Sequence, residues 1–91
     1  MSKLEEMLEE TGEVWFELGG GKYDRRKFLC WAKANGLKWM NGEEIKETDD
    51  CFFHMIVSKY RTIANISTMC FIHFKNKPKY ILDFKDFLKN R

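Results

Sequence analysis

The chain has 91 residues, of which 44% are hydrophobic and 15% aromatic, and its formal net charge at pH 7 is +2. This length allows one domain, and this composition excludes intrinsic disorder. No apolar run approaches the ~20 residues that a membrane-spanning helix needs, and the acidic start MSKLEEMLEE has no signal-peptide core. We therefore expect a single cytoplasmic domain, whose cysteines are reduced.

The charges are distributed unevenly along the chain. Residues 1–17 contain one Lys and six Glu, a balance of −5, whereas residues 18–91 contain fifteen Lys or Arg and eight Asp or Glu, a balance of +7. We divide the domain into an acidic N-terminal helix, residues 1–12, and a basic α+β body, residues 13–91. The body should attract an anion or an acidic surface, although solvated faces with the acidic helix docked on the body explain the same charges.

The first part of the sequence predicts a helix, a strand and a second helix. A capping box begins a helix over residues 2–10. Apolar residues alternate over residues 13–18, as they do in a half-buried strand. Asp24 fits the N-cap of a helix over residues 24–35, in which apolar residues recur at helical spacing.

The second part predicts strands and a terminal helix. The predicted elements are a short strand at 37–40, longer strands at 51–60 and 66–74 joined by a turn at 61–65, a last strand at 79–83 and a short C-terminal helix. Short connections favour pairing between neighbours, so the last three strands should form an antiparallel meander. The predicted fold is α+β, an antiparallel sheet of four to five strands with one main helix packed on it and short N- and C-terminal helices.

Three glycines at residues 19–21 separate the first strand from the second helix, and Lys22 follows them. The same order occurs in phosphate-binding loops, but the pattern G-x-x-x-x-G-K-[ST] fails. Phe16 stands where the first glycine should be, and Tyr23 stands where Ser or Thr should be. A Walker-type site is therefore excluded. Glycine amides at a helix start still bind anions in other proteins, and a simple turn is the alternative.

Two Cys-x₂-His pairs, Cys51/His54 and Cys70/His73, contain the residue types of a zinc site. Both pairs lie in predicted strands, where positions i and i+3 point to opposite faces, so each pair should diverge. The acidic residues 43–50 lack the spacing of an EF-hand loop, and no catalytic triad or carboxylate pair is recognisable. We therefore predict no metal, no cofactor and no enzymatic activity.

Cations and aromatic residues are mixed along the body in a way that suits an anionic partner. Cations contact phosphates and aromatic rings stack on bases, although the sequence has neither an RRM signature nor a helix-turn-helix. Several of the cations fall in the first turn of the predicted second helix, where the helix dipole favours negative charge. The predicted partner- or anion-binding residues are Lys22, Tyr23, Arg25, Arg26, Lys27, Lys38, Trp39 and Arg61.

Two segments carry a family resemblance, FLxWAKxNGLKWxNG at residues 28–42 and YILDF at residues 80–84. They resemble small accessory proteins of phages and prophages in low-GC Gram-positive bacteria. Those proteins pair a helix ending in G-(I/L)-x-W-x-x-G with a closing I-x-(D/E)-F. The glycine triplet and the acidic start do not belong to this pattern.

The resemblance implies a non-enzymatic protein that occupies a surface or sequesters a ligand, as inhibitors of bacterial defence systems do. We therefore predict a phage-type binding protein, comparable to an anti-CRISPR, which blocks a larger host protein or nucleoprotein complex in the bacterial cytoplasm. The alternative is a binder of nucleic acid or of a nucleotide signal through the basic and aromatic surface. For the acidic helix, docking on the body, nucleic-acid mimicry and homodimer formation are all open.

Overall fold

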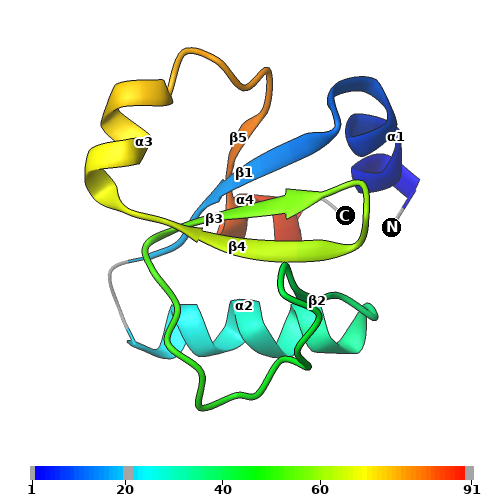
Figure 1. The fold of residues 1–91 in the computed structure, drawn as a ribbon, viewed down its shortest axis with the longest axis vertical. Coiled ribbons are helices and arrows are strands. Elements are labelled where there is room, and N and C mark those ends of the chain that lie inside the picture. The colour runs from blue at the N-terminus through cyan, green and yellow to red at the C-terminus, as the bar shows by residue number, and fades with distance from the viewer. Residues whose placement is uncertain (1, 20–21, 90–91) are drawn as a thin grey trace.

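The computed structural model describes residues 2–19 and 22–89, which form a five-stranded sheet and four helices (Figure 1). In chain order the elements are α1 (Ser2–Thr11), β1 (Glu13–Glu17), α2 (Lys22–Ala34), β2 (Lys38–Trp39), β3 (His54–Ser58), β4 (Thr62–Ile66), α3 (Thr68–Phe74), β5 (Ile81–Asp83) and α4 (Phe84–Lys89). The predicted α+β class is confirmed.

The sheet is mixed, with the strand order β2-β4-β3-β1-β5. β3 pairs antiparallel with both β1 and β4, whereas β5 pairs parallel with β1 and β2 pairs parallel with β4. The predicted antiparallel sheet and its terminal meander are therefore wrong. The last strand does not lie beside the strand that precedes it, because the chain returns to the far side of β1.

Residues 68–74 form the helix α3, although we predicted a strand there. Ser67 has an extended backbone at the N-cap of α3, and its hydroxyl accepts a hydrogen bond from the Cys70 amide at 3.2 Å. β4 occupies residues 62–66, where we predicted a turn. A short apolar run fits a strand or a helix, and the Ser67 cap favours the helix.

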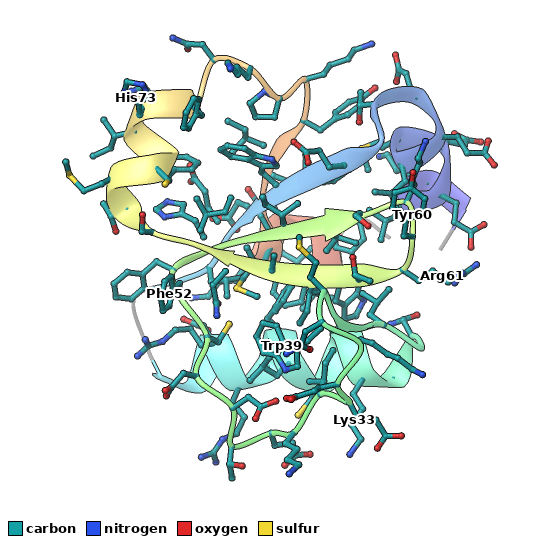
Figure 2. All side chains as sticks on the ribbon, viewed as in Figure 1. Lys33, Trp39, Phe52, Tyr60, Arg61 and His73 are labelled. Carbon is teal, nitrogen blue, oxygen red and sulfur yellow. The ribbon has the colours of Figure 1, made fainter. Side chains whose placement is uncertain are left out.

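One face of the sheet carries the core. The antiparallel register places Val14 opposite Val57 and Phe16 opposite Met55, and all four side chains are fully buried. Aromatic side chains of α2 and α4 pack on Phe16, and the partly buried Trp39 lies beneath the β3–β4 hairpin (Figure 2). The helix arrangement thus differs from the predicted one, because α4 shares this face with α2.

The opposite face of the sheet is covered only in part, by α3. Phe71 is the residue of α3 that contacts the sheet: its ring stacks on the His54 imidazole with 3.8 Å between centroids and lies 6.0 Å from the Trp15 ring. No residue of α3 is buried. The helix is therefore attached to the domain mainly through one aromatic side chain.

The acidic helix α1 docks on its own chain. Leu4, Met7 and Leu8 belong to the same hydrophobic core as the inner face of the sheet. Of the roles left open for this helix, the structure shows docking in cis.

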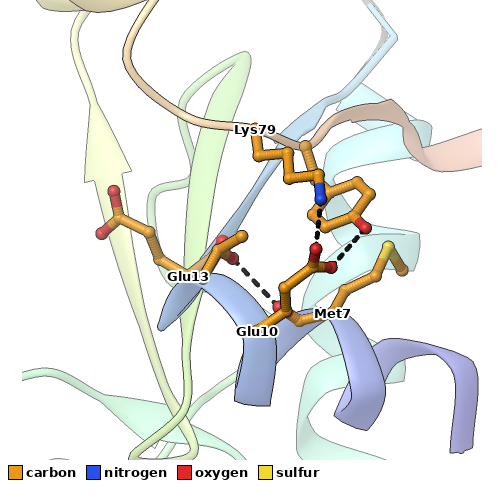
Figure 3. A network of polar contacts seen from close by, with 6 residues as sticks. Met7, Glu10, Glu13 and Lys79 are labelled. Atoms are coloured by element: carbon orange, nitrogen blue, oxygen red, sulfur yellow. Dashed lines mark hydrogen bonds and ion pairs between the residues drawn. The ribbon is translucent and has the colours of Figure 1, made fainter.

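Ion pairs complete the docking of α1. The Glu10 carboxylate pairs with Lys79 and accepts a hydrogen bond from the Tyr80 hydroxyl at 2.6 Å (Figure 3). The hydrogen bond from Lys79, and after it the one from Tyr80, lowers the pKa of Glu10. The hydrogen bond to Glu10 raises the pKa of Tyr80. Glu5 lies 3.4 Å from Arg61 at the other end of the helix. Part of the positive charge of the body is thus balanced within the molecule.

Candidate functional site

The start of α2, which we predicted to meet an anion, has a carboxylate of its own. The helix begins at Lys22, so Asp24 lies within its first turn and not at the predicted N-cap position. The Asp24 carboxylate lies against Gly19, where an added Cβ would clash with it, and Lys85 Nζ is 3.3 Å from Asp24 Oδ2. Asp24 thus supplies, within the helix itself, negative charge of the kind that the dipole favours. Gly20 and Gly21 lie outside the described residues, as do the side chains at 22 and 23.

Arg25 makes internal contacts, whereas Arg26 and Lys27 are exposed. The Arg25 guanidinium lies 5.0 Å from the centroid of the Phe53 ring, and its Nη1 donates to the Cys51 carbonyl at 3.4 Å. Arg25 and Arg26 line a cleft of about 420 Å³ between α2 and the loop at 47–52. Three acidic side chains of that loop line the same cleft, so the charge of its lining is mixed.

Trp39 fastens a loop inside the domain. Its indole Nε1 donates to Asp49 Oδ2 at 2.7 Å, and the same oxygen accepts from the Lys46 amide at 2.8 Å. These two hydrogen bonds, the one from Lys46 first, lower the pKa of Asp49. The neighbouring Lys38 amide donates to the Arg61 carbonyl at 3.1 Å, so the backbone of β2 meets the β3–β4 turn at these two residues. Arg25, Arg26 and Lys27 thus lie at the start of α2, whereas Lys38 and Arg61 lie beside the β3–β4 turn. Trp39 belongs to neither group, because it bonds the loop that contains Asp49.

The two Cys-x₂-His pairs do not converge. Cys51 is buried, and burial raises its pKa to about 12. Cys70 and His73 are both exposed on α3, so the strand geometry predicted for this pair is wrong. Among the residues that the structure describes, no group of three or more His, Cys, Asp or Glu side chains could hold a metal ion.

At one end of the β3–β4 hairpin, large apolar side chains are exposed. β3 begins and β4 ends here, and the Phe52 amide donates to Asn65 Oδ1 at 2.9 Å, which holds Phe52 close to the start of α3. The exposed fraction is 79% for Met69, 58% for Ile72 and 44% for Phe52. In Figure 2, Phe52 and His73 of α3 lie on the same side of the molecule. We call the exposed apolar residues at this end the apolar end: Phe52, Phe53, Met69, Ile72 and Phe74.

The other end of the hairpin is the turn formed by Lys59, Tyr60 and Arg61. Tyr60 is 76% exposed, and Lys59 Nζ lies 5.3 Å from the centroid of its ring. Figure 2 shows Tyr60 and Arg61 on the side of the molecule opposite Phe52. With Lys38, which contacts Arg61 through the backbone, these residues form what we call the basic tip.

The sequence analysis predicted Lys38 and Arg61 as binding residues and did not include the apolar end. A signal was present, because residues 51–82 contain no Asp or Glu and five cations: Lys59, Arg61, Lys75, Lys77 and Lys79. The apolar end and the turn of the basic tip both fall in this acid-free stretch. The exposed residues of α3 were indistinguishable from core residues once a central strand was predicted for them.

No helix in the described part of the chain is long and apolar enough to cross a membrane. Comparisons with protein-family models, with curated proteins and with solved structures found no match to this chain.

Proposed function

We propose that this chain is a non-enzymatic binding protein that occupies the surface of a larger protein through its apolar end. The observation that carries the proposal is the exposure of α3, a helix of seven residues with the sequence TMCFIHF and no buried residue. Contiguous exposed apolar side chains mark interaction sites on small soluble domains. A partner that covers them removes apolar surface from water, which favours association.

The charges around the apolar end favour an acidic partner. Lys75 and Lys77 follow α3 directly, and no described acidic side chain forms a salt bridge with either of them. Lys77 Nζ lies 4.8 Å from the centroid of the Phe74 ring, so the positive charge borders the apolar side chains. A complementary partner presents apolar side chains surrounded by Asp or Glu. A second copy of this chain fits less well, because it would bring the same lysines to the interface.

We further propose that the partner is a host protein or nucleoprotein complex in the bacterial cytoplasm, and that binding inhibits it. The resemblance of residues 28–42 and 80–84 to phage accessory proteins supports this step as an analogy. Inhibition by occupation needs shape and charge but no reacting groups, which suits a domain whose clearest surface feature is an apolar helix.

The test is a plating assay in a Gram-positive host that carries a CRISPR or restriction system. Expression of the chain should raise the plating efficiency of a phage that the system excludes. Ile72→Glu and Met69→Glu should each abolish the effect, because they place a charge at the centre of the docking surface. Lys46→Ala, an exposed change in the 43–50 loop, is the control, and melting temperatures establish that each variant is folded.

Two results would count against the proposal. Full activity of Ile72→Glu would show that the apolar end is not the docking surface. Unchanged plating with the wild-type chain across CRISPR, restriction and abortive-infection systems would reject the inhibitor role.

A further inference from the structure

The basic tip contains a residue with positive φ. Arg61 has φ 61°, in the left-handed region that side chains with a Cβ disfavour. The Arg61 amide donates to the Ser58 carbonyl at 3.1 Å, which closes a three-residue turn in which the left-handed position usually holds Gly. A cation at a position where Gly would be less strained suggests that its side chain is used.

The turn is also held rigidly. The hydrogen bonds that hold it are Tyr60 N to Ser58 Oγ at 3.0 Å, Ser58 Oγ with Thr62 Oγ1 at 2.9 Å, Lys59 N to Gly12 O at 2.9 Å and Lys38 N to Arg61 O at 3.1 Å. The Tyr60 ring is therefore exposed on a fixed backbone. A ligand that stacks on it has less conformational freedom to remove than on a flexible loop.

We infer that the basic tip is a contact site for single-stranded nucleic acid, in which Lys38, Lys59 and Arg61 bind phosphates and Tyr60 stacks on a base. Phosphates attract clustered cations, and an aromatic ring stacks on any base that is not already paired and stacked. A duplex hides the faces of its bases, and an acidic protein would leave the exposed ring without a role. Single-stranded nucleic acid uses both features, and the inference does not depend on the apolar end.

Acidic side chains of α1 lie beside the tip and oppose nucleic-acid binding there. Glu5 Oε1 is 3.4 Å from Arg61 Nη2, and Glu5 and Glu9 line a shallow depression together with Lys59 and Arg61. The two paired side chains are 62% and 51% exposed. An ion pair this exposed is weak and does not offset the backbone strain at Arg61. A phosphate therefore displaces Glu5 from Arg61, and removal of Glu5 should strengthen binding.

The experiment is fluorescence polarisation of a labelled single-stranded oligo(dT) with the purified full chain at ~50 mM salt, with affinity expected to fall steeply as salt rises. Tyr60→Ala and Arg61→Gly should each weaken binding by about tenfold, since loss of one stacked base or one phosphate contact has effects of this order. Tyr60→Phe keeps the ring and should bind as the wild type does. Glu5→Gln should bind more tightly.

Lys75→Ala is the matched control, because it removes one positive charge at the opposite end of the hairpin. It should leave the affinity unchanged, as should Ile72→Glu. Melting temperatures separate loss of binding from unfolding, and Arg61→Gly removes the strained side chain without removing a core residue.

Several results would overturn the inference. The wild-type chain could fail to bind oligo(dT) at ~50 mM salt, or it could bind duplex DNA more tightly than the single strand. An equal loss for Lys75→Ala and Arg61→Gly would show diffuse attraction in place of a site. Equally tight binding of poly-glutamate would show that the tip binds any polyanion and that Tyr60 does not stack on a base.

Discussion

The apolar end and the basic tip lie at opposite ends of the same hairpin, but they are held in different ways. At the apolar end the backbone is unstrained, and α3 rests on the sheet chiefly through Phe71, which stacks on His54. At the basic tip the backbone has a positive φ at Arg61, and hydrogen bonds fix the turn from both sides. α3 thus has one aromatic anchor, whereas several hydrogen bonds hold the turn.

This difference suits the two kinds of partner that we propose. Burial of apolar surface is non-directional, so a helix held by one anchor can adjust to the surface that covers it. Stacking and phosphate contacts depend on the positions of ring and charge, so a fixed turn favours them. The two ends should therefore respond separately to mutation, and the following predictions test that independence.

The largest effect is expected at the anchor of α3. Phe71→Ala removes a half-buried ring that contacts both His54 and Trp15, so it should lower the free energy of unfolding by about 2 kcal/mol, less than for a fully buried Phe. Urea denaturation gives the stability, and hydrogen exchange shows where it is lost. The amides of α3 should exchange much faster, while those of the β3–β4 turn should be unchanged.

Ile72→Ala is the control for that experiment, because Ile72 is exposed on the same helix and its truncation should change stability by less than ~0.5 kcal/mol. Faster exchange at both ends of the hairpin after Phe71→Ala would show that the ends are coupled and that the comparison is wrong.

A smaller difference in the free energy of unfolding is expected at the basic tip, where glycine should be more stable than alanine in place of Arg61. Arg61→Gly and Arg61→Ala both remove the exposed pair with Glu5, but only glycine adopts φ 61° without strain. The glycine variant should therefore be more stable than the alanine variant by about 1 kcal/mol. The measurement is the difference between the urea midpoints of the two variants. Hydrogen exchange of the α3 amides is the control, and it should be the same in both variants if the effect is local. Equal stability of the two variants would mean that the turn is not strained at this residue.

The elements that sequence reasoning identified are those with local signals. Helical spacing and its flanking residues predicted α2 within two residues at either end, and alternation predicted β1. The helix α3 was missed because the run from Ser67 to Phe74 has strand-like composition, although Ser67 caps its first turn. The parallel pairing of β5 with β1 was also missed, because it joins segments far apart in the chain.

The site was harder to predict than the fold. Cations and aromatic residues are visible in a sequence, but their partners are not. Trp39 bonds Asp49, ten residues away in the sequence, and Arg25 packs on Phe53 from another part of the chain. Only the tertiary structure distinguishes side chains such as these, which make contacts inside the domain, from the exposed side chain of Tyr60. The acid-free stretch at 51–82 was the one local feature that pointed to both ends of the hairpin.

The smallest expected effect is a pH dependence of the stability that arises at His54, beside the apolar end. His54 lies under the Phe71 ring with Nδ1 buried and without a partner among the described residues, and burial lowers its pKa below the ordinary value of 6.5. Glu17, opposite His54 on β1, raises this pKa but does not reverse the direction. The folded chain therefore binds a proton less readily at His54 than the unfolded chain does.

The sign of the effect follows from this difference. Above pH 6.5 the imidazole is neutral in both states, and its contribution to stability is fully present. As the pH falls below that value the unfolded chain takes up a proton first, so stability declines until the folded pKa is passed. Urea unfolding at roughly pH 7 and pH 5.5 measures the decline. His54→Phe, which keeps a ring under Phe71, should remove this part of the decline, whereas His73→Gln, at an exposed position on α3, should not.

Because the turn at 59–61 contains no histidine, oligonucleotide binding by His54→Phe should follow that of the wild type at both pH values. A divergence between them would mean that protonation at the apolar end reaches the basic tip through β3.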